Sequence, residues 1–165
     1  MDPDYLDIIL NFLKEIGLSV IVKPIEGPTF LPGLKIEKGS LVVDVKKLLY
    51  PGDILHEAGH LATMTPDVRN EMDDTLPQND LHQGGEIMAQ AWSYAACVHL
   101  KIDPTIVFHE NGYKGGGAHI IKNFTDGYDV GLPLLQYAGM AYEKKKAVEL
   151  NTPGFPHMVK WLREQ

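Results

Sequence analysis

The sequence predicts an α+β protein in which one helix and a short mixed sheet come first and a mostly helical half follows. Apolar residues recur at helical spacing before residue 17, β-branched runs lie between residues 19 and 45, and helical patterns dominate the chain after residue 51. The chain has 165 residues, of which 44% are hydrophobic and 22% are charged. Length and composition therefore predict a single soluble globular domain over residues 1–165.

The first element is expected to be a helix between Pro3 and Gly17. Leu6, Ile9 and Leu13 fall on one face at helical spacing. Proline suits the first turn of a helix and glycine suits its end, so both boundaries are marked in the sequence. The apolar face of this helix is expected to pack on the sheet.

The sheet is expected to follow directly. Residues 19–25 (SVIVKPI) form a β-branched run, and residues 34–45 hold two further runs that flank the turn residues EKGS. We predict one strand followed by a hairpin. Residues 27–33 (GPTFLPG) are rich in proline and glycine and are expected to form a connecting loop.

The rest of the chain is expected to consist of helices joined by loops. A helix over residues 54–64 follows Pro51, with Asp53 available to cap it, and a strongly helical pattern covers residues 86–100. Between them, residues 65–83 lack apolar periodicity and are expected to form a long, mobile loop. Further helices are expected within residues 104–112, within 112–127 after a glycine loop, and over 130–145 and 155–164.

The composition excludes several kinds of partner. The formal net charge is -7 and the basic residues are scattered, so no nucleic-acid surface is expected. The N-terminus lacks the basic region and cleavage site of a secretory signal, and no stretch is apolar enough to cross a bilayer. Cys97 is the single cysteine, so no intrachain disulfide can form. We expect a cytoplasmic protein without membrane partners, and its oligomeric state stays open.

The strongest functional signal is the stretch LHEAGHLAT at residues 55–63. His56 and His60 are one helical turn apart, so both imidazoles can bind one zinc ion. Glu57 would lie near the open coordination position, where a carboxylate can accept a proton from metal-bound water and pass it to a leaving amine. The alternative is a helix that carries two histidines by chance. The small residues beside the histidines permit close packing of the helix, and they favour the metal site over this alternative.

A third ligand is expected from the next helix. Glu86 opens that helix directly after the loop, and a carboxylate would complete a two-histidine site suited to hydrolysis. An acidic residue at that place also suits the positive end of a helix dipole, which is the alternative role. His82 and Asp80 are the other candidate ligands.

A hydrolase of this kind also needs a group that stabilises an oxyanion. Gln90 shares a helix face with Glu86 and could hold a substrate carbonyl or orient a ligand. Spacing does not distinguish among the remaining candidates, which are Tyr94, Tyr113 and His119. Outside this set, Cys97 is expected to be a core residue and His109 an ordinary histidine at a helix end.

The two stretches together resemble a known family. LHEAGHLAT followed by GGEIMAQAWSYAA (residues 84–96) is similar to the zincin metallopeptidases of the gluzincin arrangement, and most similar to the small ImmA and IrrE type peptidase domains. The resemblance implies a zincin-like fold, Zn2+ held by His56, His60 and Glu86, and a small intracellular metallopeptidase that acts on a peptide or protein. The chain departs from the thermolysin-like pattern because Gln90 stands where that pattern has an aspartate.

Two other functions are compatible with the same motif. A zincin-fold binding or regulatory domain would hold a metal without turnover, and a metal-dependent hydrolase could act on a non-peptide amide or ester. Glu57 favours a hydrolase, because a structural zinc site needs no general base.

Overall fold

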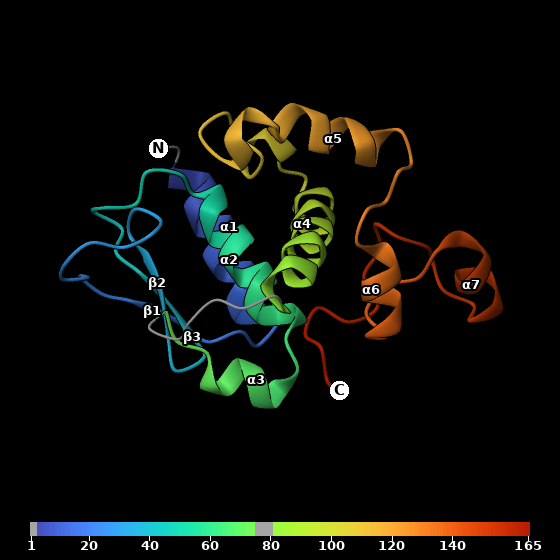
Figure 1. Ribbon diagram of the computed structural model, residues 1–165, viewed down its shortest axis with the longest axis horizontal. Coiled ribbons are helices and arrows are strands. Elements are labelled where there is room, and N and C mark those ends of the chain that lie inside the picture. The colour runs from blue at the N-terminus through green and yellow to red at the C-terminus, as the bar shows by residue number, and fades with distance from the viewer. Residues whose placement is uncertain (1–2, 75–80) are drawn as a thin grey trace.

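The computed structural model describes the backbone of residues 3–74 and 81–165, with side chains for residues 5–74 and 85–165. Within these residues the chain forms a three-stranded sheet and a larger set of helices. The sheet and three helices (α1, α2 and α4) make up one half, α5 lies across one end of α4, and α6 and α7 lie on the side away from the sheet (Figure 1). The predicted α+β class is therefore confirmed.

The sheet is mixed, with the strand order β1-β3-β2. β1 (Val20–Val22) runs parallel to β3 (Ser40–Val43), whereas β2 (Leu34–Glu37) and β3 form an antiparallel hairpin. Lys38 and Gly39 make the turn with φ values of 49° and 79°, a left-handed pair that matches the twist of a tight hairpin. The predicted strand and hairpin are both confirmed.

α1 (Pro3–Glu15) and α2 (Gly52–Thr63) pack against each other beside the sheet. α1 ends just before Gly17, whose φ is 88°, as the sequence predicts. Its apolar face is buried through Ile9 and Leu13, both with no exposed surface. α1 lies behind α2 in Figure 1, so that α2 is held between α1 and α4.

α4 (Leu81–Leu100) packs along α2 and forms the second half of the core. It begins before the predicted start at residue 86, because the helix already includes Gly84 and Gly85. Trp92, which is fully buried on α4, donates its indole N–H to the backbone oxygen of Trp161 at 3.0 Å. Cys97 is a buried free thiol on the same helix, as expected. No helix in the described part of the chain is both long and apolar enough to cross a membrane.

α3 (Pro66–Glu71) is a helix where the sequence predicted a loop over residues 65–83, so that prediction is wrong for this part. Arg69 holds α3 in place by donating to the carbonyl oxygens of Leu61 at 2.8 Å and Arg163 at 2.8 Å. These bonds join α3 to the end of α2 and to the end of the chain. Six residues are too few for helical periodicity to show in a sequence. The predicted mobility of the stretch stays a prediction.

Shorter elements make up the remainder, namely η1 (Pro104–Ile106), η2 (Tyr113–Gly115), α5 (Gly117–Thr125), α6 (Leu132–Tyr137) and α7 (Lys144–Glu149). α5 confirms the helix predicted after the glycine loop. The helix predicted within residues 104–112 is only the single 3-10 turn η1. The helix predicted over residues 130–145 is split, because α6 stops before Gly139, whose φ is 73°.

The helix predicted over residues 155–164 is wrong, since the structure has no helix there. The backbone N–H groups of Val159 and Lys160 both donate to Met140 O, at 2.9 and 3.2 Å. The Trp161 ring packs edge-on against Phe12, with ring centroids 4.9 Å apart. Tertiary contacts with the core thus override a helix-like pattern in this last segment.

Candidate metal centre

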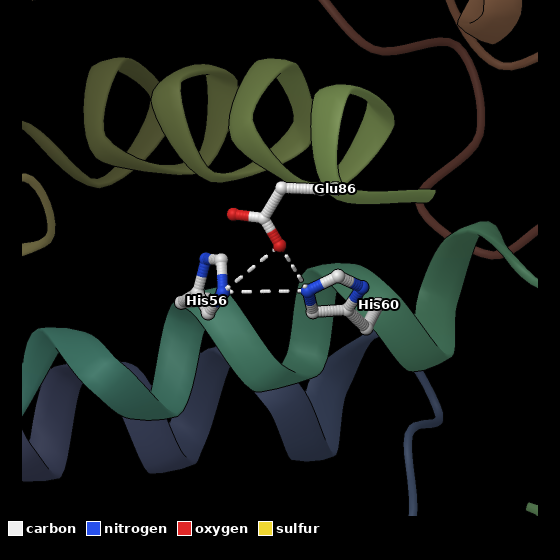
Figure 2. A group of neighbouring side chains, drawn as sticks. All are labelled: His56, His60 and Glu86. Atoms are coloured by element: carbon white, nitrogen blue, oxygen red, sulfur yellow. Dashed lines mark hydrogen bonds and ion pairs between the residues drawn. The ribbon is translucent and has the colours of Figure 1, made fainter. Parts of the chain in front are cut away.

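Three side chains from two helices converge on one point (Figure 2). His56 Nε2, His60 Nε2 and Glu86 Oε2 form a group whose ligand atoms all lie within 4.8 Å of one another. The separations are 2.9 Å between His60 and Glu86, 3.3 Å between the two histidines, and 3.6 Å between His56 and Glu86. These are the three metal ligands that the sequence predicts, and the fold brings them together.

The motif helix presents both histidines on one face. Residues four apart lie one above the other on a helix, and the two imidazole rings stand 4.8 Å apart and perpendicular. The neighbouring residues of the helix anchor it in the core, because Leu55, Ala58 and Gly59 are all buried. The ligands are therefore placed by packing that does not depend on a metal.

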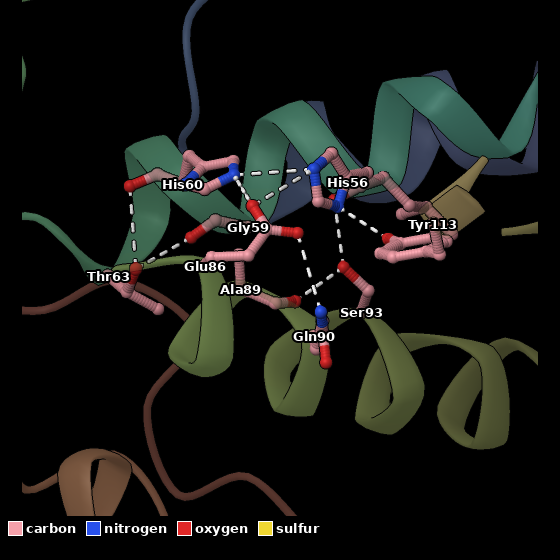
Figure 3. Close-up of polar contacts among 10 residues, drawn as sticks. His56, Gly59, His60, Thr63, Glu86, Ala89, Gln90, Ser93 and Tyr113 are labelled. Carbon is pink, nitrogen blue, oxygen red and sulfur yellow. Dashed lines mark hydrogen bonds and ion pairs between the residues drawn. The ribbon is translucent and has the colours of Figure 1, made fainter. Parts of the chain in front are cut away.

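Gly59 explains how Glu86 reaches the histidines. A Cβ atom at this position would lie 3.0 Å from Ala89 O and 3.2 Å from Ser93 Oγ, tighter than ordinary contacts, so the glycine favours the close approach of α2 and α4. Ser93 is fully buried and donates to Ala89 O at 2.6 Å, and it also reaches Leu55 O on α2 at 3.3 Å (Figure 3). The close crossing brings the first turns of α4 over the motif.

The separations fit a tetrahedral metal site. Zinc binds nitrogen and carboxylate oxygen at about 2.0–2.2 Å, so two ligands of a tetrahedron lie about 3.3–3.6 Å apart. The distances from His56 Nε2, 3.3 Å to His60 and 3.6 Å to Glu86, match this range. The remaining pair, His60 and Glu86, is closer at 2.9 Å because it forms a hydrogen bond. Two imidazoles and one carboxylate also leave a fourth position for water, as in catalytic zinc sites.

The two oxygens of Glu86 have separate partners. Oε2 faces the histidines, whereas Oε1 accepts a hydrogen bond from the side-chain amide of Gln90 at 3.4 Å (Figure 3). Burial favours the protonated carboxyl, but the hydrogen bond with His60 and the charge of His56 outweigh burial and lower the pKa of Glu86 to about 2. Glu86 is thus a carboxylate at neutral pH, the form in which it can bind a cation.

The two histidines differ in their environment. Burial and the neighbouring His60 lower the pKa of His56 to about 4, so this ring is neutral at pH 7. Burial also acts to lower the pKa of His60, but the hydrogen bond to Glu86 and the charge of Glu57 raise it above its ordinary value. The carboxylates of Glu86 and Glu57 thus favour a positive charge at the point where a metal cation would bind.

Glu57 lies between the two histidines in the sequence and is half-buried. Burial raises the pKa of Glu57 from 4.5 to about 7, and His60 opposes the rise while Asp74 and Glu86 add to it. A carboxylate with such a pKa can accept a proton near neutral pH and release it again. This is the behaviour expected of a general base.

Tyr113, a sequence candidate for the oxyanion, contacts a ligand instead. Its hydroxyl lies 2.7 Å from His56 Nδ1, the ring nitrogen that does not face Glu86 and His60 (Figure 3). Gln90 is likewise bonded to a ligand, Glu86. Tyr94 stacks on Phe124, with ring centroids 4.5 Å apart, and packs within the core.

The remaining candidates do not join the group. His119 is exposed on α5. Asp80 and the side chain of His82, the two alternative ligands, lie outside the described residues.

A second pair of side chains, which the sequence did not predict, has one member on the same helix as the two histidines. His109 is not an ordinary helix-end histidine, because its Nε2 lies 2.8 Å from Oδ1 of the buried Asp53 and its ring stacks on Tyr50 at 4.1 Å. Asp53 is on α2, one turn before Glu57. The sequence carries only a weak signal here: His109 is followed by Glu110, as in the His-Glu motif, but nothing in the spacing relates His109 to Asp53.

No protein-family model matches the chain, and neither a curated protein nor a solved structure is detectably similar to it.

Proposed function

We propose that the protein is a zinc-dependent hydrolase, most simply a small metallopeptidase with a zincin-like site. The observation that carries this proposal is the convergence of the ligand atoms of His56, His60 and Glu86 on one point. Glu57, the proposed base, is on the same helix as the two histidines. Two nitrogen ligands and one oxygen ligand suit zinc better than the harder cations magnesium and calcium. The geometry supports a site with an open position, which is the arrangement that hydrolysis requires.

The roles of the residues follow from their positions. Bound zinc would supply Lewis-acid chemistry, polarising a carbonyl and lowering the pKa of water. His56, His60 and Glu86 hold the cation, and Gln90 keeps Glu86 turned so that Oε2 faces the histidines. Glu57 accepts the proton of the attacking water and passes it to the leaving amine, for which its pKa of about 7 is suited.

The resemblance of the HEAGH and GGEIMAQAWSYAA stretches to gluzincin peptidases favours a peptide or protein substrate. We propose that the protein acts in the cytoplasm, because its single cysteine is a buried free thiol and needs no oxidising compartment.

The test is a substitution that separates catalysis from metal binding. Glu57→Gln keeps the size of the side chain and both histidines, so the zinc content should stay near that of the parent. The rate of peptide hydrolysis should fall by at least about 100-fold, the contribution of a positioned base. Glu71→Gln, on the surface of α3, is the matched control and should leave both quantities unchanged.

Panels of peptides and of non-peptide amides and esters, assayed with and without a chelator, give the substrate class. Chelator-sensitive turnover of peptides supports the proposal. A protein that binds zinc but hydrolyses none of these compounds would instead be a binding or regulatory domain, and the proposal would be wrong.

A further inference from the structure

The segment from η1 to η2 runs along the first turns of α2, the helix that carries both histidines, and contacts it at three places. A Cβ atom on Gly52 would lie only 1.9 Å from Ile106 O, so the two backbones are in direct contact. His109 bonds to Asp53 at 2.8 Å, and Tyr113 bonds to His56 at 2.7 Å. Contacts at residues 52, 53 and 56 of α2 therefore fix the position of the Tyr113 ring beside His56.

The backbone at Tyr113 supports the same conclusion. Tyr113 and Lys114 have φ values of 54° and 53°, in the left-handed region that costs non-glycine residues about 1 kcal/mol or more each. Such a conformation persists only where the surroundings hold it. Here the Tyr113 ring contacts Phe108, with centroids 5.3 Å apart, and its hydroxyl contacts His56.

The chemistry of imidazole gives this contact a function. A neutral histidine that binds a metal through Nε2 must carry its proton on Nδ1, and the partner of Nδ1 fixes this tautomer and the orientation of the ring. Carboxylates and backbone carbonyls, the usual partners, can only accept a hydrogen bond. A tyrosine hydroxyl can donate or accept, so it can serve His56 both before and after a metal binds.

We propose that Tyr113 is the positioning residue of His56: the Tyr113 hydroxyl accepts a hydrogen bond from Nδ1–H of His56, and this presents the Nε2 lone pair of His56 to the metal. The inference rests on the proposed metal site and adds a residue to it. It replaces the sequence-based role of Tyr113 as an oxyanion donor, because the hydroxyl lies on the Nδ1 side of the ring.

The first test is the affinity for zinc, measured by competition with a chromophoric chelator. Tyr113→Phe removes one oxygen atom and keeps the ring, and it should weaken zinc binding about 10- to 100-fold. Tyr137→Phe removes a hydroxyl that is on α6 in a residue 85% exposed, and it should bind zinc as the parent does. Melting in the presence of a chelator shows whether each variant is folded.

The second test reports on the tautomer of His56, first in the parent and then in the variant. A long-range 15N–1H NMR spectrum of the zinc-loaded parent should show His56 protonated at Nδ1 and metal-bound at Nε2. In Tyr113→Phe the Nδ1 proton resonance should shift or exchange faster, which loss of packing elsewhere would not cause.

The outcomes separate this inference from the proposed function. Zinc binding by the parent, with equal affinity in Tyr113→Phe and an unchanged His56 spectrum, would overturn the role of Tyr113 and leave the metal site intact. Binding of His56 through Nδ1 would overturn it as well. If the parent binds no zinc, the proposed function fails first, and the inference fails with it.

Discussion

Replacing Glu86 with glutamine removes the carboxylate from the candidate metal centre while keeping the length of the side chain. In the parent, a metal that binds only the folded protein adds about 2.7 kcal/mol of stability when its free concentration is 100 times the dissociation constant. A protein of 150–250 residues gains about 2–4 °C in melting temperature per kcal/mol, so zinc should raise the melting temperature by about 5–11 °C.

The loss in the variant follows from the geometry. Glu86 Oε2 lies 2.9 Å from His60 Nε2 and 3.6 Å from His56 Nε2, so it supplies one of three ligand atoms and the only negative charge among them. We expect Glu86→Gln to weaken binding by at least about 100-fold, more than the loss of a residue that only supports a ligand. At the same zinc concentration the stabilisation then falls to about 0.4 kcal/mol. The melting temperature should rise by only about 1–2 °C.

The assay is thermal unfolding with excess chelator and with a fixed free zinc concentration. Each variant is compared with its own metal-free form, because Glu86→Gln also removes an ion pair with His60. Glu71→Gln serves as the control and should show the full parental shift. The reasoning is refuted if Glu86→Gln retains that full shift, since Glu86 would then not be a ligand.

Three further predictions concern pH and packing. In the metal-free protein the pKa of Glu57 is about 7 in the folded state and 4.5 in the unfolded state. The folded state therefore binds this proton more tightly, and the stability that the proton contributes is lost as the pH rises between these two values. Urea unfolding at pH 5 and pH 7.5 should therefore show that the parent loses unfolding free energy relative to Glu57→Gln as the pH rises. A difference between parent and variant that is the same at both pH values would contradict the raised pKa of Glu57. Arg69→Ala removes hydrogen bonds to Leu61, Met64 and Arg163 and should cost at least about 2 kcal/mol of unfolding free energy. Limited proteolysis of that variant should cut within residues 65–74 and near the C-terminus. A cleavage pattern identical to that of the parent would show that Arg69 does not hold these two segments in place. Trp161→Ala should cost about 2 kcal/mol, less than the 3–5 kcal/mol of a fully buried tryptophan, because Trp161 is only partly buried against Phe12 and Trp92. An unfolding free energy equal to that of the parent would mean that the last segment does not stabilise the core.

The side chains of the candidate metal centre could be predicted because they follow local rules. His56 and His60 are one helical turn apart, so their position on one helix face can be predicted from the sequence spacing alone. The prediction of Glu86 required one more inference, namely that the chain returns after the motif helix and begins another helix beside it. Gly59, which permits the close crossing of α2 and α4, is part of the motif itself.

The partners of the ligands could not be predicted in the same way. Tyr113 contacts His56 across 57 positions of sequence, and His109 contacts Asp53 across 56. Both contacts depend on the backbone approach of Ile106 to Gly52, which no periodicity encodes. Among four tyrosine, histidine and glutamine candidates, spacing alone gave no reason to select Tyr113.

The errors in the fold have the same origin. Residues 155–164 carry a helix-like pattern, yet their polar backbone groups bond to Met140 and their apolar side chains cover the core. α3 is too short to show a period and is held by the side chain of Arg69. In both cases contacts between distant parts of the chain determine the local conformation.

The most direct test of the metal centre is a crystal structure of the zinc-loaded protein with anomalous scattering data collected at the zinc absorption edge. We expect one strong anomalous peak per chain, about 2.0–2.2 Å from His56 Nε2, His60 Nε2 and a Glu86 oxygen, with density for a water at the fourth position. The absence of any peak between α2 and α4 after incubation with zinc would contradict the metal site. A peak held by His56 and His60 but not by Glu86 would contradict the assignment of the third ligand.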